Sequence, residues 1–132
     1  MIAVAVETPL QEAVAALLRQ SDAVAAALYP GAPRRAIDPQ TLAVPGTHVL
    51  VARVDGIAAG CCALFEQGEA AAELKRMIVD DAFRRRGIGE ALLRAAETQA
   101  LRLGIAVLRL EVGTRNEAAH AMYVRAGFTP RG

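Results

Sequence analysis

The stretch that decides the fold of this chain joins the end of an apolar run, a basic loop and the start of a helix. It reads Met77-Ile78-Val79-Asp80-Asp81-Ala82-Phe83-Arg84-Arg85-Arg86-Gly87-Ile88-Gly89. Three arginines stand just before the helix, where the helix dipole already contributes about +0.5 of a charge and the first N–H groups lack partners. Cations there make sense if an anionic ligand occupies the helix start. Gly87 and Gly89 would let the backbone approach such a ligand closely. The stretch predicts a strand, an anion-binding loop and a helix.

Two other interpretations of the arginine loop compete with an anion site. One is a solvated basic turn before an ordinary helix, which needs no ligand. The other is a nucleotide motif, but the Gly-Lys-Ser/Thr ending of a Walker loop is missing. Gly87-Ile88-Gly89 also lacks the third glycine of a dinucleotide fingerprint. Nucleotide hydrolysis and NAD binding are therefore poor fits.

The sequence after the loop predicts a helix, a strand, a second helix and the start of a further strand. Apolar residues recur with helical period from Gly87 to Gly104, where the helix stops. Residues 105–112 predict a strand, and residues 116–127 predict a helix that Asn116 caps and Gly127 ends. Phe128 would begin a last strand, which we expect to be short or missing because the sequence stops at Gly132.

The N-terminal part predicts a strand, a helix and a loop. Residues 1–7 are expected to form the first strand. Thr8-Pro9-Leu10-Gln11 provides a capping hydroxyl, a proline at the first helical position and a Gln three residues after the cap, so a helix should begin there. That helix should continue or restart as far as Leu28, and residues 29–47 predict a loop with a short turn after Asp38-Pro39.

The middle of the chain predicts an antiparallel meander. Two β-rich runs, residues 48–54 and 57–65, are joined by Asp55-Gly56, which favours a two-residue hairpin turn. A turn at residues 67–69 and a strand over residues 70–79 should follow. Together with the crossover helix, this order predicts an α+β fold whose mixed, mainly antiparallel central sheet is flanked by helices.

Length and composition predict one domain over residues 1–132, without a membrane segment. The hydrophobic fraction of 54% includes no apolar run of the ~18 residues that a membrane span needs. No signal peptide is expected at the N-terminus. The two cysteines, Cys61 and Cys62, are adjacent, which suits neither an ordinary disulfide nor a zinc site. We therefore expect a cytoplasmic protein that holds no metal.

The net charge and the aromatic content of the chain indicate which partners it is expected to bind. The net charge of +1 and an aromatic fraction of 4% disfavour nucleic acid as a partner. An uncovered strand at the end of the sheet could pair with a second copy of the chain, which leaves a homodimer open.

The arginine loop resembles the acetyl-CoA signature of the GNAT superfamily of N-acetyltransferases, which is Gln/Arg-x-x-Gly-x-Gly/Ala after a strand that ends in Val. A second block, Leu110-Glu111-Val112 through Asn116, Ala119, Tyr123 and Gly127-Phe128, is similar to the strand and helix that follow in that family. Asp81 stands where the family often has proline, and relatives usually continue beyond Gly132 into a strand that lines the acceptor pocket. The resemblance covers about residues 48–128. It implies a direct transfer of an acetyl group from acetyl-CoA to a primary amine.

The resemblance also implies which residues bind acetyl-CoA. The backbone of Met77 and Val79 would pair with the pantetheine arm, and an N–H at the splayed strand would polarise the thioester carbonyl. Backbone groups of the loop would hold the pyrophosphate, with Arg84 and Arg86 as side-chain helpers. The full implied set is Met77, Ile78, Val79, Arg84, Arg85, Arg86, Gly87, Ile88, Gly89, Glu90, Asn116, Ala119 and Tyr123. Core packing of Met77 and Val79, and helix capping by Asn116, are the alternatives.

Three residues are implied to take part in the chemistry. Tyr123 matches the tyrosine that protonates the departing CoA thiolate in the family, and its alternative is a core aromatic. Glu73 and Glu111 both match positions at which relatives carry a general base. Either glutamate could instead be a paired carboxylate on the sheet, with Lys75 or Arg76 as the partner of Glu73.

The sequence leaves three functions open. The resemblance favours a small molecule as the amine acceptor, because nothing in the N-terminal half suggests a peptide groove. An N-terminal or other protein N-acetyltransferase is the second interpretation. The third is an acyl-CoA-binding module without turnover, against which the presence of Tyr123 and both glutamates argues.

Overall fold

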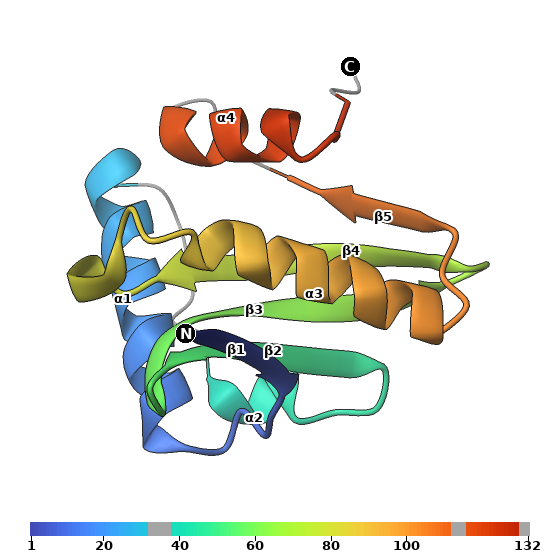
Figure 1. Ribbon diagram of the computed structural model, residues 1–132, viewed down its shortest axis with the longest axis horizontal. Coiled ribbons are helices and arrows are strands. Elements are labelled where there is room, and N and C mark those ends of the chain that lie inside the picture. Colours follow the sequence, from blue (N-terminus) through green and yellow to red (C-terminus); the bar gives the residue numbers. More distant parts are fainter. Residues whose placement is uncertain (32–37, 112–115, 130–132) are drawn as a thin grey trace.

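A five-stranded sheet in the order β1-β2-β3-β4-β5 forms the centre of the fold (Figure 1). The computed structural model describes residues 1–31, 38–111 and 116–129. The strands are β1 Ile2–Val6, β2 Thr47–Val54, β3 Ile57–Gly68, β4 Ala71–Val79 and β5 Val107–Leu110. Neighbours are antiparallel except β4 and β5, which are parallel. The predicted mixed, mainly antiparallel sheet of an α+β fold is confirmed.

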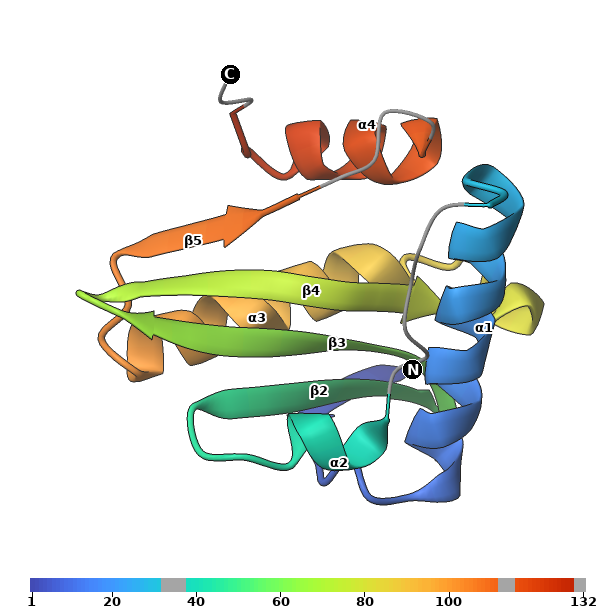
Figure 2. The same cartoon turned by 180° about the vertical axis from the view of Figure 1, so that it is seen from behind.

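Helices cover both faces of this sheet. They are α1 Glu12–Leu28, α2 Pro39–Leu42, α3 Ile88–Arg102 and α4 Glu117–Arg125, with a short 3₁₀ turn, η1, at Asp81–Phe83. Helix α3 lies on one face, and α1 and α2 lie on the other (Figures 1 and 2). Helix α4 lies beyond β5, at one edge of the sheet. No helix in the described ranges is long and apolar enough to cross a membrane.

The core has two parts, one on each face of the sheet. Leu64 and Leu74 pack with Leu92 of α3 on one face, whereas Val51 and Ala63 pack with Leu17 of α1 on the other. The adjacent cysteines illustrate this division, because successive side chains of a strand point to opposite faces. Cys62 belongs to the α3 side and Cys61 to the α1 side, and both are free thiols. Burial raises the pKa of Cys61 to about 12 and also raises the pKa of Cys62.

Both hairpin turns have two residues in the left-handed region of backbone conformation. Asp55 and Gly56 have φ values of 51° and 84°, so the predicted β2–β3 turn is confirmed. The β3–β4 turn is formed by Glu69 and Ala70, with φ values of 54° and 58°. The sequence placed this turn at residues 67–69, which is too early, because β3 stays paired up to Gly68, opposite Ala71.

Helix α1 begins at Glu12, so the predicted start at Thr8-Pro9 is wrong. The Thr8 hydroxyl accepts a hydrogen bond from the N–H of Leu10 at 3.1 Å and forms a local turn. Gln11 donates through its side chain to Glu7 Oε1 at 3.1 Å. Arg53 of β2 holds Glu7 through two further hydrogen bonds, of 2.9 and 2.8 Å. The expected capping groups are therefore used to connect β1 to its neighbour.

The rest of the N-terminal segment agrees with the sequence where it is described. Helix α1 runs without interruption to Leu28. The predicted turn after Asp38-Pro39 is α2, whose first turn is capped by Asp38 Oδ1 at 3.1 Å from the N–H of Gln40. Residues 32–37 of the expected loop lie outside the described residues.

The C-terminal elements are largely as expected, except that β5 is shorter. Helix α3 ends at Arg102, before Gly104 with a φ of 75°. Strand β5 covers Val107–Leu110 in place of residues 105–112. Asn116 caps α4 by accepting a hydrogen bond from the N–H of Ala119 at 3.3 Å, as predicted. Ile105 is buried before β5 begins, and Val112 lies outside the described residues.

The last predicted strand is absent from the described residues. Phe128 and Thr129, the final described residues, are not in a strand, and residues 130–132 lie beyond them. Phe128 instead packs with its ring edge against Tyr123, at 6.0 Å between ring centroids.

We expect Gly60→Ala to lower the free energy of unfolding by about 1–3 kcal/mol, the usual cost of overpacking a core. A Cβ at Gly60 would lie 2.8 Å from the carbonyl oxygen of Ile78 and 3.0 Å from Ile88 Cγ2. Backbone and buried side chain would both have to shift. Urea denaturation of the wild type and the variant measures this loss.

Gly89→Ala is the matched control for Gly60→Ala. Its Cβ would meet Met122 Sδ at 2.7 Å, but that atom is near the end of a flexible side chain that can move. The loss of stability should therefore be smaller than for Gly60→Ala. An equal or larger loss in Gly89→Ala would contradict the close packing of β3 on β4.

Candidate active site

The site begins where β4 and β5 separate. The two strands are paired only from Ala71 with Val107 to Leu74 with Leu110. Strand β4 continues to Val79, and in the described part of the chain it has no neighbour on that side after Leu74. This separation leaves a length of β4 backbone open toward the edge of the sheet.

Strand β4 directs the backbone groups of Met77 and Val79 into this opening. The N–H of Asp80 donates to the carbonyl of Ala59 on β3 at 2.8 Å. Backbone groups of successive strand residues point to opposite sides, so Ile78 also faces β3, whereas Met77 and Val79 face away from it. Of the three β4 residues singled out in the sequence, two therefore present hydrogen-bonding groups to the opening. The side chain of Ile78 is buried in the core on the α1 side.

A β-bulge lies next to the point of separation. Cys61 pairs with Ile78 and Ala63 with Lys75, so two residues of β4, Arg76 and Met77, lie opposite one residue of β3. Arg76 has a φ of 60°, in the left-handed region. Bulges bend a strand and increase its twist, which turns β4 as it leaves β5.

Asp80 fixes the loop that follows β4. One carboxylate oxygen, Oδ1, accepts from the N–H of Ala82 at 2.9 Å and so caps the η1 turn. The other, Oδ2, accepts from Gln20 Nε2 of α1 at 3.0 Å. Both oxygens of Asp80 are thus used to hold the entry to the arginine loop against β4 and α1.

The arginine loop presents a row of free backbone donors. Arg85 and Gly87 have φ values of 64° and 78°, which set the shape of the loop before α3 begins. The N–H of Ala91 bonds to the carbonyl of Gly87. Among the described residues, no acceptor is found for the N–H groups of residues 85–90. These donors, at the positive end of the α3 dipole, form a ready site for an anion.

The side chains of the loop add positive charge around these donors. Arg84 Nε lies 3.0 Å from Asp81 Oδ1, with the Arg84 side chain 53% exposed. The Arg86 guanidinium lies over the Phe83 ring, 5.3 Å from its centroid. Both arginines keep further N–H groups available to a ligand. Glu90, in contrast, is 3.7 Å from Arg125 of α4, so this carboxylate links the two helices.

Helix α4 closes on the start of α3. Gly89 allows this approach, because Met122 occupies the space that a Cβ would take. Ala119 packs against the core on the α3 side, and Asn116 caps the helix. A cavity of about 320 Å³ lies between the two helices, and Glu90, Met122 and Arg125 are among its lining residues.

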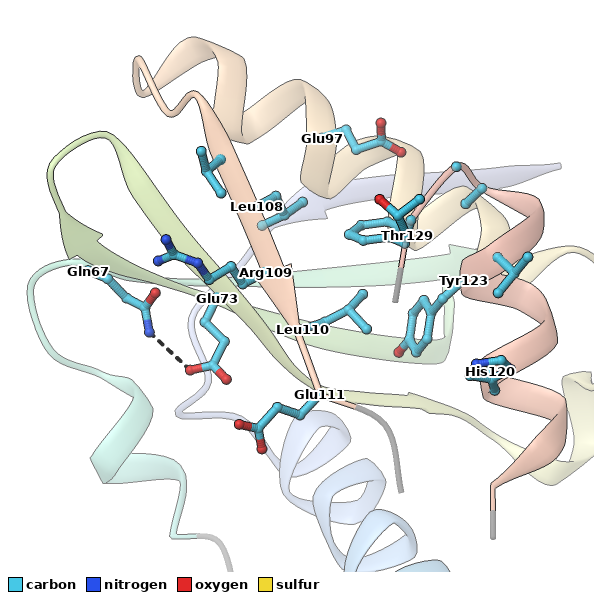
Figure 3. A pocket seen from close by; sticks show the side chains of 15 residues that line it. Gln67, Glu73, Glu97, Leu108, Arg109, Leu110, Glu111, His120, Tyr123 and Thr129 are labelled. Carbon is cyan, nitrogen blue, oxygen red and sulfur yellow. Dashed lines mark hydrogen bonds between the residues drawn. The ribbon is translucent and has the colours of Figure 1, made fainter. Parts of the chain in front are cut away.

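The three candidate catalytic residues all line one larger cavity, of about 1010 Å³ (Figure 3). Tyr123 comes from α4, Glu73 from β4, and Glu111 directly follows β5. Leu110 lies between Tyr123 and the two carboxylates in Figure 3. The cavity therefore extends around the free edge of β5, with the tyrosine on one side of the strand and the glutamates on the other.

Tyr123 is held in a protonated form that reaches this cavity. Its residue is 8% exposed and belongs to the core on the α3 side. Burial, with a contribution from Cys62, raises the pKa of the Tyr123 hydroxyl to about 12. Among the described residues, the Tyr123 hydroxyl has no hydrogen-bond partner, yet it is not one of the fully buried oxygens, all of which have partners there. The hydroxyl is therefore accessible from the cavity that Tyr123 lines. A protonated hydroxyl in this position can donate a proton.

The two glutamates differ in their surroundings. Glu73 Oε1 accepts from Gln67 Nε2 at 3.1 Å and lies 3.4 Å from Lys75 Nζ, with a side chain 15% exposed. The sequence-based alternative of a Glu73–Lys75 pair is therefore observed. Glu111 is exposed and has no ion pair or hydrogen-bond partner among the described residues. Glu111 is thus the carboxylate that is free to receive a proton.

Arg109 and Gln67 are among the lining residues that were not singled out in the sequence. Arg109 alternates with Leu108 and Leu110, so a strand over this segment places it on the face opposite the two leucines. That pattern alone does not show which face borders a cavity. Gln67 could not be found at all, because its contact with Glu73 depends on the register of β3 and β4. No group of three or more His, Cys, Asp or Glu side chains in the described ranges is placed to hold a metal ion.

Comparison with known proteins identifies relatives of this chain. Residues 13–128 match the model of the acetyltransferase (GNAT) family. An IAA acetyltransferase of Azospirillum brasilense is 38% identical over 132 residues, which cover 99% of this chain and 86% of the relative.

Two solved structures share the fold over nearly the whole chain. A Klebsiella pneumoniae protein, provisionally named an acyl-CoA N-acyltransferase, has a TM-score of 0.82 at 31% identity, over 99% of this chain and 85% of that one. The ribosomal-protein-S18-alanine N-acetyltransferase of Escherichia coli has a TM-score of 0.77 at 24% identity, over 100% of this chain and 80% of that one.

We expect Tyr123 to titrate near pH 12 in the folded protein, as its raised pKa requires. Because the unfolded chain releases this proton first, near the ordinary pKa of about 10, the Tyr123 contribution to stability is lost as the pH rises from 10 to 12. The difference in tyrosinate absorbance between the wild type and Tyr123→Phe measures the titration. Tyr29, the other of the two tyrosines, is present in both proteins and cancels. A midpoint near 10 would contradict the burial of the hydroxyl.

Proposed function

The chain belongs to the acetyltransferase (GNAT) family, and from that premise we propose that it transfers an acetyl group directly from acetyl-CoA to a primary amine of a small molecule. The observation that carries the proposal is the row of free N–H groups at residues 85–90, next to the open backbone of Met77 and Val79. A pyrophosphate fits the first feature and an extended amide-bearing arm fits the second. The two features are continuous in the chain, as the two parts of one ligand would require.

The arginine loop would hold the diphosphate of acetyl-CoA. Its N–H groups can bind phosphate oxygens at the positive end of α3, and the guanidinium groups of Arg84, Arg85 and Arg86 can offset the negative charge. The exposure of these side chains leaves them free to reorient around the ligand. Asn116 and Ala119 lie on α4, close to the start of α3, where they can border the same ligand.

The opening in β4 would hold the reactive end. The N–H and C=O groups of Met77 and Val79 can pair with the amides of a pantetheine arm in place of β5. An N–H at this point can also stabilise negative charge that develops on the thioester carbonyl oxygen. Acetyl-CoA supplies an activated acetyl group, and the chain supplies the donors and the proton transfers around it.

Tyr123 would protonate the departing thiolate. The raised pKa keeps its hydroxyl protonated at neutral pH, which is the form that an acid requires. Its hydroxyl faces the cavity beside the end of β5, close to where the strands separate. The tyrosine is also part of the core, and this packing is compatible with the proposed role as an acid.

Glu111 is our assignment for the general base. An amine nucleophile must lose a proton, and an alkylamine with a pKa near ~10.4 needs more help than an α-amine near ~8. The carboxylate of Glu111 has no competing partner in the described residues, whereas Glu73 is already bonded to Gln67 and lies beside Lys75. Glu73 would then contribute negative charge that attracts the protonated amine into the cavity.

A small acceptor agrees with the size of the cavity and with the sequence relative. About 1010 Å³ is at the upper end of the range of small-molecule sites, ~300–1,000 Å³. The Azospirillum relative is named for acetylation of IAA. The Escherichia coli enzyme, which is named for a ribosomal protein, shares the fold at an identity too low to transfer its acceptor. Free cysteines agree with a cytoplasmic location for the reaction.

Calorimetric titration with acetyl-CoA tests the proposed donor site. The wild type should bind, and the double variant Arg84→Ala, Arg86→Ala should bind at least tenfold more weakly, since hydrogen bonds to charged groups contribute about 1.5–3 kcal/mol each. Arg102→Ala is the control, because this exposed arginine lies at the far end of α3 and should leave the affinity unchanged. Absence of binding to the wild type would overturn the acetyl-CoA assignment, and equal affinities would remove the arginines from it.

Glu111→Gln should lower kcat by about 10²–10⁴, the usual contribution of a general base. Glu73→Gln should have a smaller effect on kcat, since its charge acts on the entry of the amine. Both variants should bind acetyl-CoA as the wild type does. The reverse order of the two effects would move the base to Glu73, and small effects in both would exclude a carboxylate base.

A further inference from the structure

Arg109 of β5 is the one Lys or Arg residue among the described residues that line the large cavity. Its side chain points to the same side of β5 as those of Glu73 and Glu111 (Figure 3). No hydrogen bond or ion pair of its guanidinium is found in the part of the chain that the structure describes. The other charged side chains of the lining are carboxylates, so the exposed guanidinium of Arg109 is the cationic group of this cavity that can bind an anion.

The neighbouring carboxylates do not form ion pairs with the guanidinium of Arg109 in the described residues. Its register partner on β4 is Glu73. The Glu73 carboxylate instead bonds to Gln67 and lies beside Lys75, and no ion pair with Arg109 forms within 4.0 Å. Glu111, which comes directly after β5, also stays unpaired in the described residues. Within the described residues, one cation on β5 and one carboxylate directly after this strand are therefore unpaired.

The spacing of these two groups defines what could bridge them. Glu111 lies one residue beyond β5 and two residues after Arg109, and the two side chains point to the same side (Figure 3). In extended chain, at ~3.3 Å per residue, their backbone positions differ by roughly 6.6 Å. Leu108 and Leu110 point to the other side, toward α4 (Figure 3). An amine at Glu111 with an anionic group a few bonds away would bind both residues. A simple alkylamine would leave Arg109 unpaired.

We propose that Arg109 binds an anionic group of the acceptor, so that the substrate class is an amine that also carries a carboxylate or a phosphate. This inference rests on the proposed function and specifies its acceptor. A guanidinium forms paired hydrogen bonds with either anion, which fixes the orientation of the acceptor. The amine is thereby directed to Glu111, near the point where β4 and β5 separate.

Matched pairs of amines test this inference in a steady-state acetylation assay. The anionic members are 3-aminopropanoate, 4-aminobutanoate and 2-aminoethyl phosphate. Their counterparts without the anionic group are propylamine, butylamine and 2-aminoethanol. The wild type should have a kcat/KM at least tenfold higher for the anionic member of a pair. The first two pairs report on a carboxylate and the third on a phosphate.

Arg109→Ala should remove this preference. A lost hydrogen-bonded charge pair lowers kcat/KM for the anionic amine by about 10- to 100-fold. The value for the counterpart without the anionic group should change less than twofold, and Arg109→Lys should retain part of the preference. Arg102→Ala, an exposed arginine outside the cavity, should behave as the wild type with every amine.

The outcomes separate this inference from the proposed function, because acetyl-CoA binding is measured on the same preparations. If acetyl-CoA binds but the wild type does not prefer the anionic amines, or acetylates none of the six, the inference is overturned and the donor site stands. An equal loss for both members of a pair in Arg109→Ala also overturns it. Arg109 would then be a charge that protects an edge strand from pairing. If acetyl-CoA does not bind, the proposed function itself fails.

Discussion

Up to Leu74, β4 is paired with β5, but beyond that residue no described residue pairs with β4 on this side. The rest of the candidate site depends on this interruption. Backbone N–H and C=O groups in a sheet are seldom left unpaired. The groups of Met77 and Val79 therefore form a surface that a strand-like ligand can complete. The same departure of β5 brings Leu110 and Glu111 to the rim of the large cavity.

Several separate contacts maintain the interruption. The bulge at Arg76 and Met77 turns β4. Gly60 of β3 allows β4 and α3 to pack closely against β3. Asp80 then joins the end of β4 to α1 through Gln20 and to the η1 turn through Ala82. The loop of free donors at the start of α3 is thereby attached to the same strand that carries the open backbone.

Strand β5 divides the cavity by the chemistry of its two sides. The α4 side is apolar, and there burial keeps the Tyr123 hydroxyl protonated. The other side carries Glu73, Arg109 and Glu111, which are charged and more exposed. The proposed acid therefore lies in the core, whereas the proposed base lies in water. The alternation of side chains along a single strand produces both environments.

The sequence by itself determined the features that depend on neighbouring residues. The Asp55-Gly56 turn, the Asn116 cap and the arginine loop before α3 follow from local backbone preferences, and they were predicted correctly. Tertiary structure decided the rest. Helix α1 begins at Glu12 because Arg53, far along the chain, holds Glu7. The Glu73 pairing and the placement of Arg109 depend on strand register, which sets long-range contacts that no local pattern encodes.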